Sequence, residues 1–592
     1  TPTTASTNQT YTISSVLNGV TYQASIYLSA SYLELTPSVE GAELLVGQAM
    51  TNINFQYNAG AASGSGSGSN SGTYNGNGTA WMVKNIASGG VSSFPDRLVA
   101  VGNTLFFYAS DGQNGFELWK SNGTSSGTVM VKNINSGSGS QASSNPNYLT
   151  EMGNTLYFSA MDTTNNGYQL WKSDGTASGT VMVTAINSGG TANPGLHTDG
   201  FVIMNNNLYF SAEDGTNGVE LWKSDGTASG TVMVKDINSG SGESFSYTPA
   251  ISPVVFNNEL YFQAKDGTSG FELWKSDGTA SGTVMVKDIN SGSGDSKPEH
   301  LTVVGNTLFF MANDGINGFE LWKSDGTASG TVMVKDINSG SAHGAPNYLA
   351  AVGNTLFFNA NDGINGAELW KSDGTALGTV MVKNINSGTS SSPNYLTAVG
   401  NTLYFSADDG THGDELWKSD GTASGTVMVK DIGNAGSNGD PGWLTAVGNT
   451  LYFQADTGTY GGELWKSDGT ASGTVLVQDI YSGISSSGAH EFVLVDNTIY
   501  FSARDGTHGD ELWALDPANI TGLGSGSGSG SGGGMTNVTG ATSCVASPSL
   551  PNGLNIDSST CTISGTPTVA TSNTTYTVTA VINSVTYQGS VW

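Results

Sequence analysis

The stretch WKSDGTASGTVMVKDI, residues 222–237, sets the pattern for most of this chain. The same residues return unchanged at 274–289, 322–337 and 417–432, and near copies start at other tryptophans. Self-similarity with a period of about 40–50 residues is the signature of proteins built from repeated supersecondary units. The sequence therefore has to be interpreted first of all as a repeat architecture.

The tripeptide ELW or QLW marks each copy of the repeat. It places tryptophan at Trp119, Trp171, Trp222, Trp274, Trp322, Trp370, Trp417, Trp465 and Trp513. Each of these tryptophans follows a leucine inside a short run of strand-forming residues. We therefore predict that they form the packed core between neighbouring units, and the alternative is a row of sugar-binding platforms.

Each unit contains four candidate strands, as the unit around Trp417 illustrates. They are 395–399, 402–407, 415–418 and 426–432, separated by Gly-Asn and Asp-Gly turns. No segment has the 3.6-residue apolar period of a helix, so the chain is predicted to be all-β. Four-stranded units of this length are typical of β-propeller blades. The unit resembles the ELWxxDGT repeats of secreted microbial proteins.

The phase of the repeat predicts a closed ring over residues 72–522. The segment opens with a lone fourth strand, 78–86, and ends with a third strand, 511–513, that has no fourth. Pairing these two completes the last unit and leaves no exposed sheet edge. The sequence thus predicts a nine-bladed β-propeller, and an open β-solenoid is the alternative.

The two ends of the chain match each other. Residues 1–27 align without a gap to residues 566–592, so that Tyr11 corresponds to Tyr576 and Gln23 to Gln588. Each copy reads as two alternating strands joined by a short turn. This duplication predicts units in tandem, with residues 1–29 as the closing strands of a preceding domain.

A second motif precedes the C-terminal copy. LPNGLNIDSSTCTISGTP, residues 550–567, resembles the LPxGLxxxxxxGxIxGTP signature of the putative-Ig (cadherin/Ig-like) repeats of large surface proteins, with Cys561 at the usual glycine. The resemblance implies an Ig-like β-sandwich split in sequence, with its first part at 30–61 and its second at 535–592. The propeller would then be an insertion in this domain, tolerated where loop ends lie close together.

Gly/Ser-rich segments at 62–71 and 523–534 separate the two predicted domains. Such segments behave as flexible linkers. Cys544 and Cys561 both belong to the second part of the predicted Ig-like domain. In an extracellular all-β domain such a pair is predicted to form a disulfide, and two free buried thiols are the alternative.

Residues with catalytic or metal-binding chemistry are sparse. No serine-hydrolase, HExxH or phosphate-loop motif is present. Nearly identical blades should also present nearly identical surfaces, whereas catalysis needs one asymmetric arrangement. The sequence therefore predicts that the protein is not an enzyme and needs no cofactor. Asp409 and Asp420 are weak candidates for Ca²⁺ ligands, since Asp-Gly pairs are primarily turn residues.

Charge and composition restrict the partners. The formal net charge is −29, with 19 Lys and Arg against 48 Asp and Glu, which disfavours nucleic acid and anionic lipid. No apolar run is long enough to insert this segment into a membrane. We expect an extracellular or cell-surface location and self-association, head to tail, through the Ig-like strands. The predicted function is a structural unit of a surface filament or layer, and the alternative is an adhesin whose propeller binds glycan or a neighbouring cell.

Overall fold

The computed structural model describes two parts of the chain at different levels of detail. Residues 80–517 are described with their side chains, except for gaps at 137–142, 163–166, 189, 246–251 and 434–435. Outside this range only the backbones of eight strands are described. The chain divides into two compact units: Thr1–Ser67 with Ser527–Trp592, and Gly68–Gly526.

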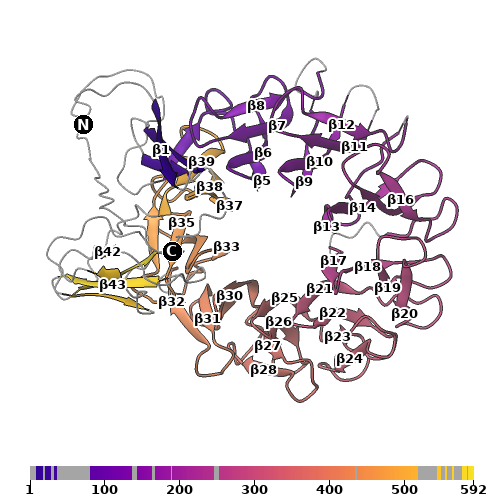
Figure 1. The fold of residues 1–592 in the computed structure, drawn as a ribbon. Helices are drawn as coiled ribbons and strands as arrows, with labels where there is room; N and C mark the ends of the chain where they lie inside the picture. The colour runs from indigo at the N-terminus through magenta and orange to yellow at the C-terminus, as the bar shows by residue number, and fades with distance from the viewer. Residues whose placement is uncertain are drawn as a thin grey trace. The chain divides into compact units, whose positions relative to one another are not determined.

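The second unit is a ring of nine four-stranded antiparallel sheets (Figure 1). The first strands of its blades are β5 (Asp96–Val101), β9 (Asn147–Met152), β13 (Val202–Met204), β17 (Val254–Phe256), β21 (Glu299–Val304), β25 (Asn347–Val352), β29 (Asn394–Val399), β33 (Gly442–Val447) and β37 (His490–Val495). The second strands are β6 (Thr104–Ser110), β10 (Thr155–Met161), β14 (Asn207–Glu213), β18 (Glu259–Ala264), β22 (Thr307–Asn313), β26 (Thr355–Asn361), β30 (Thr402–Asp408), β34 (Thr450–Asp456) and β38 (Thr498–Ala503).

The third and fourth strands complete each blade on its outer side. The third strands are β7 (Phe116–Ser121), β11 (Tyr168–Ser173), β15 (Val219–Ser224), β19 (Glu272–Ser276), β23 (Phe319–Ser324), β27 (Ala367–Ser372), β31 (Asp414–Ser419), β35 (Gly462–Ser467) and β39 (Glu511–Leu515). The fourth strands are β8 (Val129–Lys132), β12 (Val181–Thr184), β16 (Val232–Lys235), β20 (Val284–Lys287), β24 (Val332–Lys335), β28 (Val380–Lys383), β32 (Val427–Lys430), β36 (Val475–Gln478) and, for the ninth blade, β4 (Trp81–Lys84).

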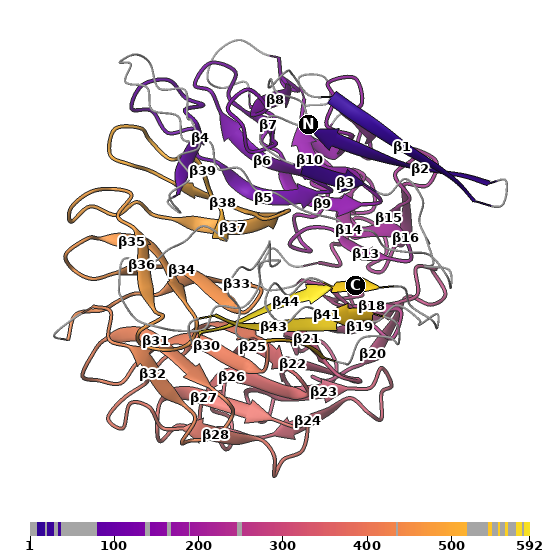
Figure 2. The ribbon, with the colours of Figure 1, turned by 60° about the vertical axis from the view of Figure 1, so that its left-hand side comes forward.

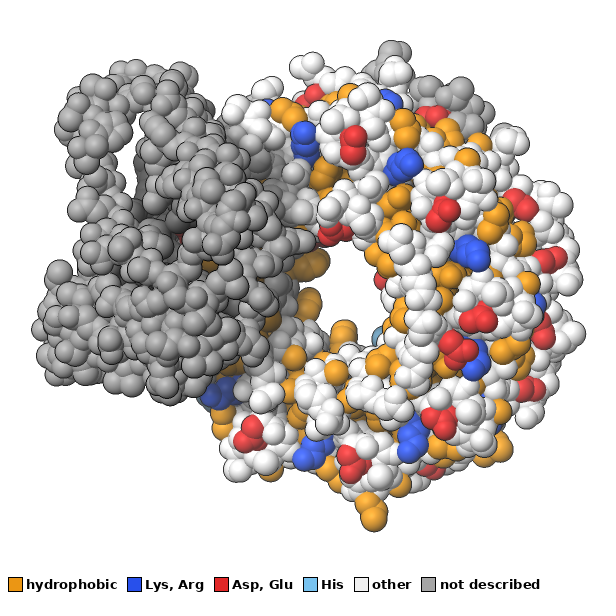
Figure 3. Space-filling model, viewed as in Figure 1, with side chains coloured by type: hydrophobic (Ala, Val, Ile, Leu, Met, Phe, Trp, Pro, Cys, Tyr) orange, Lys and Arg blue, Asp and Glu red, His pale blue; other side chains and the backbone are white. Residues whose placement is uncertain are grey.

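The first strands of most neighbouring blades contact one another around the ring, including β37 of the last blade with β5 of the first. They therefore surround the central opening, which the space-filling view shows in the propeller (Figure 3). Figure 2 shows the ring turned by 60°, so that the blades on the left of Figure 1, among them β33–β36, come forward. Together these observations confirm the predicted nine-bladed β-propeller.

The repeat motif explains the local structure of a blade. In the SDGT turn, Gly421 has φ +86°, which a side chain would strain. Thr426 donates its hydroxyl to the carbonyl of Thr422 at 2.7 Å and so ends this turn. The fourth strand is shorter than the predicted 426–432, because the amide of Ile432 donates to the Glu415 carboxylate instead of joining the sheet.

Alternation along the ELW strand gives every blade two buried faces. Trp370 packs with Phe309, Leu321 and Val334 of the preceding blade, whereas Leu369, one residue earlier, packs in the next cluster round the ring. Period-two alternation in a strand explains this division. The nine repeated tryptophans are all between 5 and 9% exposed and each lies in such an inter-blade cluster.

The N-terminal strand of the propeller closes the ring, as the phase of the repeat predicts. In β4, Lys84 pairs with Leu512 and Met82 with Trp513 of β39. Ile86 then donates its amide to the Glu511 carboxylate at 2.8 Å. The ninth blade is therefore built from both ends of the inserted segment.

The first unit is described only by its strands. Strands β1 (Gln9–Leu17), β2 (Val20–Leu28) and β3 (Leu33–Thr36) form one sheet, and β40 (Ser543–Ser547), β43 (Tyr576–Ile582) and β44 (Val585–Val591) form another. Strands β41 (Leu554–Ile556) and β42 (Ile563–Gly565) form a two-stranded sheet. The split of one Ig-like domain between 30–61 and 535–592 stays a prediction. Across the described ranges no helix is long and apolar enough to cross a membrane.

Candidate functional site

One position in the first strand of seven blades differs from the rest of the repeat. It adopts the left-handed backbone conformation, with φ between 52° and 58°, at Arg97, Tyr148, His300, Tyr348, Tyr395, Trp443 and Glu491. A residue other than glycine costs about 1–2 kcal/mol in this conformation. Strained residues of this kind concentrate at functional sites. Because the blades are otherwise nearly identical, the variety of side chains here is informative.

A β-bulge produces this conformation. In the seventh blade Asn394 pairs with Ser406 and Thr397 with Tyr404, so one extra residue lies in the first strand at Tyr395. The hydroxyl of Thr397 donates to the Tyr395 carbonyl at 2.9 Å. The eighth blade repeats this contact, and similar threonine contacts follow Tyr148 and His300. Bulges of this kind re-aim a side chain, and the threonine holds the re-aimed residue in place.

The re-aimed aromatic rings lean on the next blade around the channel. A side-chain carbon at Gly442 of the eighth blade would lie 3.7 Å from the Tyr395 ring. The Trp443 ring lies 5.4 Å from that of His490 in the ninth blade, measured between centroids. Tyr348, Tyr395 and Trp443 nevertheless remain 52, 48 and 47% exposed. They form a row of accessible aromatic surfaces on three consecutive blades.

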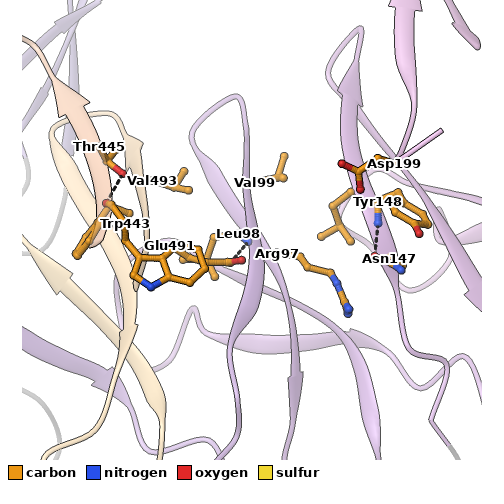
Figure 4. A pocket seen from close by; sticks show the side chains of 12 residues that line it. Arg97, Leu98, Val99, Asn147, Tyr148, Asp199, Trp443, Thr445, Glu491 and Val493 are labelled. Atoms are coloured by element: carbon orange, nitrogen blue, oxygen red, sulfur yellow. Dashed lines mark hydrogen bonds between the residues drawn. The ribbon is translucent and has the colours of Figure 1, made fainter. Parts of the chain in front are cut away.

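Three hollows with shared lining residues lie along this wall. One of about 370 Å³ is lined by Tyr348, Tyr395 and Trp443, and a second of about 300 Å³ by Tyr395, Trp443 and Asp440. The third, of about 390 Å³, continues from Trp443 past Glu491 and Arg97 to Tyr148 (Figure 4). Trp443 lines all three. We call this surface the channel-wall groove and define it by Tyr348, Tyr395, Trp443, Glu491, Arg97 and Tyr148.

At the charged end of the groove, Glu491 and Arg97 are each held by contacts with neighbouring residues. Glu491 accepts a hydrogen bond from the Leu98 amide at 3.1 Å. Burial, together with the hydrogen bond and negative charge of Asp96, raises the pKa of Glu491 to about 8. The Arg97 guanidinium lies 4.7 Å from the centre of the Tyr108 ring and donates to the Pro146 carbonyl at 3.3 Å. This end of the groove therefore offers fixed polar groups beside the aromatic row.

A ring of buried carboxylates forms a second set of unusual residues. The glutamate of ELW is fully buried in eight blades, at Glu117, Glu220, Glu272, Glu320, Glu368, Glu415, Glu463 and Glu511. In the fifth blade Glu320 accepts hydrogen bonds from the amides of Ile337 (2.8 Å), Asn338 (3.2 Å) and Gly344 (2.7 Å). It thereby fastens the chain between two blades. Burial raises the pKa of Glu320 to about 7, despite these three donors.

The second blade replaces this carboxylate by an amide. Gln169 accepts hydrogen bonds from Ile186 and Asn187 through Oε1, and its Nε2 donates to the carbonyls of Asn187 and Gly190. Sequence reasoning did not single out these residues. The available signal was a polar residue repeated next to Leu-Trp, at a position that has to be buried once the strand is packed.

The residues proposed as sites from the sequence are dispersed. Asp409 accepts hydrogen bonds from the amides of Thr411 and His412 and pairs with the His412 ring at 2.8 Å. Asp420 accepts from the amide and hydroxyl of Thr422. Both carboxylates thus close their own turns. Within residues 80–517, as far as they are described, no three His, Cys, Asp or Glu side chains gather as a metal site.

The side chains of Cys544 and Cys561 lie outside the described residues, so their disulfide stays a prediction. The long loop at 238–253 contributes to the core where it is described. Its Phe245 is 1% exposed and stacks on Phe262, with the ring centres 5.6 Å apart.

Comparison with known proteins gives one family match. Residues 524–591 match the family described as "Putative Ig domain". No curated protein matches the chain. The family match supports an Ig-like domain in the C-terminal segment, while the resemblance of the blades to ELWxxDGT repeats stays a prediction.

Among solved structures, the chain is similar to several hydrolases and peptidases. A puromycin hydrolase is 13% identical, with TM-score 0.33 over 62% of this chain and 60% of that protein. A puromycin-hydrolyzing peptidase of Mycobacterium tuberculosis is 9% identical, with TM-score 0.32 over 61 and 58%. Prolyl oligopeptidase B of Galerina marginata is 10% identical, with TM-score 0.32 over 56 and 50%. The match spans less than two thirds of each of these proteins.

These structures correct the expectation that the protein is not an enzyme. The similar solved structures are hydrolases and peptidases, so that conclusion does not stand, although the low TM-scores assign no activity to this chain. The expectation rested on the argument that nearly identical blades present nearly identical surfaces. That argument also fails, because the surfaces of the blades differ. Arg97, Trp443 and Glu491 occupy the same blade position and create an asymmetric channel wall. The described residues form an all-β structure with a nine-bladed propeller, and residues 524–591 match a putative Ig family, a combination that fits a surface protein in general terms.

Proposed function

We propose that this is an extracellular surface protein whose propeller binds carbohydrate in the channel-wall groove. The observation that carries the proposal is the row of half-exposed rings of Tyr348, Tyr395 and Trp443 on consecutive blades. The π face of an aromatic ring is electron-rich and attracts the C–H groups of a pyranose ring, while the ring also buries that apolar face. A site with an aromatic platform and few polar groups is the usual form of a small-molecule binding site.

Polar groups beside the rings suit hydroxyl recognition. Asn394, Asp440 and Gln454 line the same hollow as Tyr395 and Trp443. Carboxylate and amide groups can each bond to neighbouring sugar hydroxyls. The strained backbone beneath the rings supports a binding role, since glycine at these positions would be less strained but would provide no platform.

Removing the central ring is expected to abolish most of the binding. In a glycan-array screen followed by calorimetry with the full chain, Trp443→Ala should weaken binding of the best ligand by about 10- to 100-fold, as loss of a central aromatic contact does. Tyr460→Ala is the matched control, because Tyr460 is 43% exposed, lies between β34 and β35, and is not among the residues that line the three hollows. Equal binding by both variants, or no glycan bound by the parent protein, would contradict the proposal.

A second function, as a unit of a surface array, is favoured by the two terminal hairpins. Strands β1 and β2 pair with Tyr11 opposite Ile26, and β43 and β44 pair with Tyr576 opposite Val591, which is the same register in the two aligned copies. Their third strands differ, since β3 joins β2 whereas β40 joins β43. Each hairpin thus has a partner on the edge where the other has none among the described strands. An edge of this kind can accept a strand from another unit.

The array hypothesis predicts head-to-tail assembly through these edges. Electron microscopy of surface material should show rings at regular spacing along a fibre, because heterologous contacts that do not close generate filaments. Boiling the fibres in detergent separates the two ways of joining units. Bands at the 60.8 kDa of one unit indicate strand exchange between chains, and much larger bands indicate covalent tandem units. Stable monomers at high concentration and no fibres would be incompatible with the array.

A further inference from the structure

The channel-wall groove has a form that restricts its ligand beyond the general class of carbohydrates. Its three hollows share Trp443, and their lining residues belong to consecutive blades from Tyr348 to Tyr148. A site for the end of a sugar chain would need a wall against which the terminal sugar stops. Here the lining residues instead extend to both sides of Trp443.

The aromatic contacts repeat with the blades. Tyr348, Tyr395 and Trp443 occupy the same position in β25, β29 and β33, with φ of 52°, 52° and 56°. The three rings therefore belong to equivalent backbone positions on neighbouring blades. A position that repeats from blade to blade suits a ligand that also repeats, one sugar unit after another.

The half-exposed rings also select the shape of the sugar. A pyranose packs closely on an aromatic ring only where its face carries C–H groups and no axial hydroxyl. Glucose, xylose and N-acetylglucosamine in β-1,4 linkage keep their ring hydroxyls equatorial and leave both faces free. Asp440 and Gln454 line the same hollow as Tyr395 and Trp443 and supply a carboxylate and an amide that can bond to equatorial hydroxyls.

We propose that the groove binds the interior of a linear β-1,4-linked polysaccharide, with successive sugars stacked on Tyr348, Tyr395 and Trp443. This rests on the proposed carbohydrate-binding function and specifies its ligand. Glu491 and Arg97 then contact the chain where it leaves the aromatic row, because they line the hollow that continues from Trp443. The polymer passes along the wall without presenting an end to it.

The test uses cello-, xylo- and chito-oligosaccharides from disaccharide to hexasaccharide, titrated into the full chain by calorimetry. For one of the three series, affinity should rise by about tenfold for each added sugar that stacks on a further aromatic ring and should then level off. For the Tyr348→Ala variant, affinity should level off at a shorter oligosaccharide length, whereas Tyr460→Ala should bind as the parent protein does. A bulky fluorophore on the reducing end of the hexasaccharide should leave its affinity unchanged.

The outcomes separate this inference from the function on which it rests. If a disaccharide binds as tightly as the hexasaccharide, or the end label abolishes binding, the groove recognises a chain end and the inference is wrong while carbohydrate binding stands. The same holds if only α-linked or branched glycans bind. If no glycan binds at all, both the inference and the proposed function fail.

Discussion

Replacing the buried Glu320 by alanine is expected to lower the free energy of unfolding by about 3–5 kcal/mol, because each buried donor left without a partner costs about 1–3 kcal/mol. The substitution leaves the amides of Ile337, Asn338 and Gly344 without the acceptor that they share. It also opens a cavity beside them. Urea unfolding followed by tryptophan fluorescence measures the change.

The second blade supplies the matched control for this substitution. Glu320→Gln can keep the oxygen that Asn338 and Gly344 share, but its NH₂ group then meets the Ile337 amide, which donates to the other carboxylate oxygen, so a loss of about 1–2 kcal/mol is expected. The reverse exchange, Gln169→Glu, should also destabilise, since a carboxylate would face the carbonyls of Asn187 and Gly190. If Glu320→Ala lowers the free energy of unfolding no more than Glu320→Gln does, the carboxylate does not hold the segment between the two blades in place.

Comparing the parent protein with the Glu320→Gln variant at different pH values gives a further test. Burial raises the pKa of Glu320 to about 7, above the ordinary value of 4.5, so between these values the folded state binds a proton that the unfolded state releases. The contribution of this group to stability is therefore full below about pH 4.5 and is lost as pH rises through about 7. Relative to Glu320→Gln, the parent protein should gain melting temperature as the pH falls from 8 to 5.

The propeller could be predicted from the sequence because the same strand and turn pattern occurs in every blade. The period of the repeat predicts the four-stranded blade, and the alternation around Trp370 predicts its two buried faces. The position of residues 78–86 within the repeat predicts the closure of the ring. The end of the fourth strand was misplaced for a physical reason. The amide of Ile432 looks like part of a strand in sequence, but a buried carboxylate competes for it in the fold.

The channel-wall groove could not be predicted in the same way. Tyr395, Trp443 and Glu491 belong to three different blades, and only the closed ring brings them to one wall. A bulge sets their direction, and a bulge depends on pairing with the neighbouring strand rather than on the local sequence. The residues that vary within a uniform repeat were the available signal. Their variety could have marked the position, but not the direction in which the side chains point.

Opening the ring is the second change with a large expected effect. Replacing residues 80–88 by a Gly/Ser segment of equal length removes β4 and leaves β39 as an unpaired edge. The chain also loses the contact of Lys84 with the first blade, where its ammonium donates to the Thr128 carbonyl at 2.7 Å and lies 5.8 Å from the centre of the Trp119 ring. Exposed edges of this kind pair with other chains. Light scattering should therefore show oligomers or aggregates, and the melting temperature should fall.

A point substitution distinguishes loss of closure from a general effect of altering this segment. Val83 lies in β4, is 2% exposed and packs with Leu98, Leu105 and Trp119 of the first blade, whereas Val91 is 56% exposed. Val83→Ser should cost about 2 kcal/mol, because an apolar contact is lost and a hydroxyl is buried, and Val91→Ser less than about 0.5 kcal/mol. Hydrogen exchange should quicken in β39 and in the first blade for Val83→Ser alone, since these are the two sides of the seam. A Gly/Ser-substituted protein that remains monomeric with the parent melting temperature would mean that the ring does not depend on its N-terminal strand, and the closure would have to lie elsewhere.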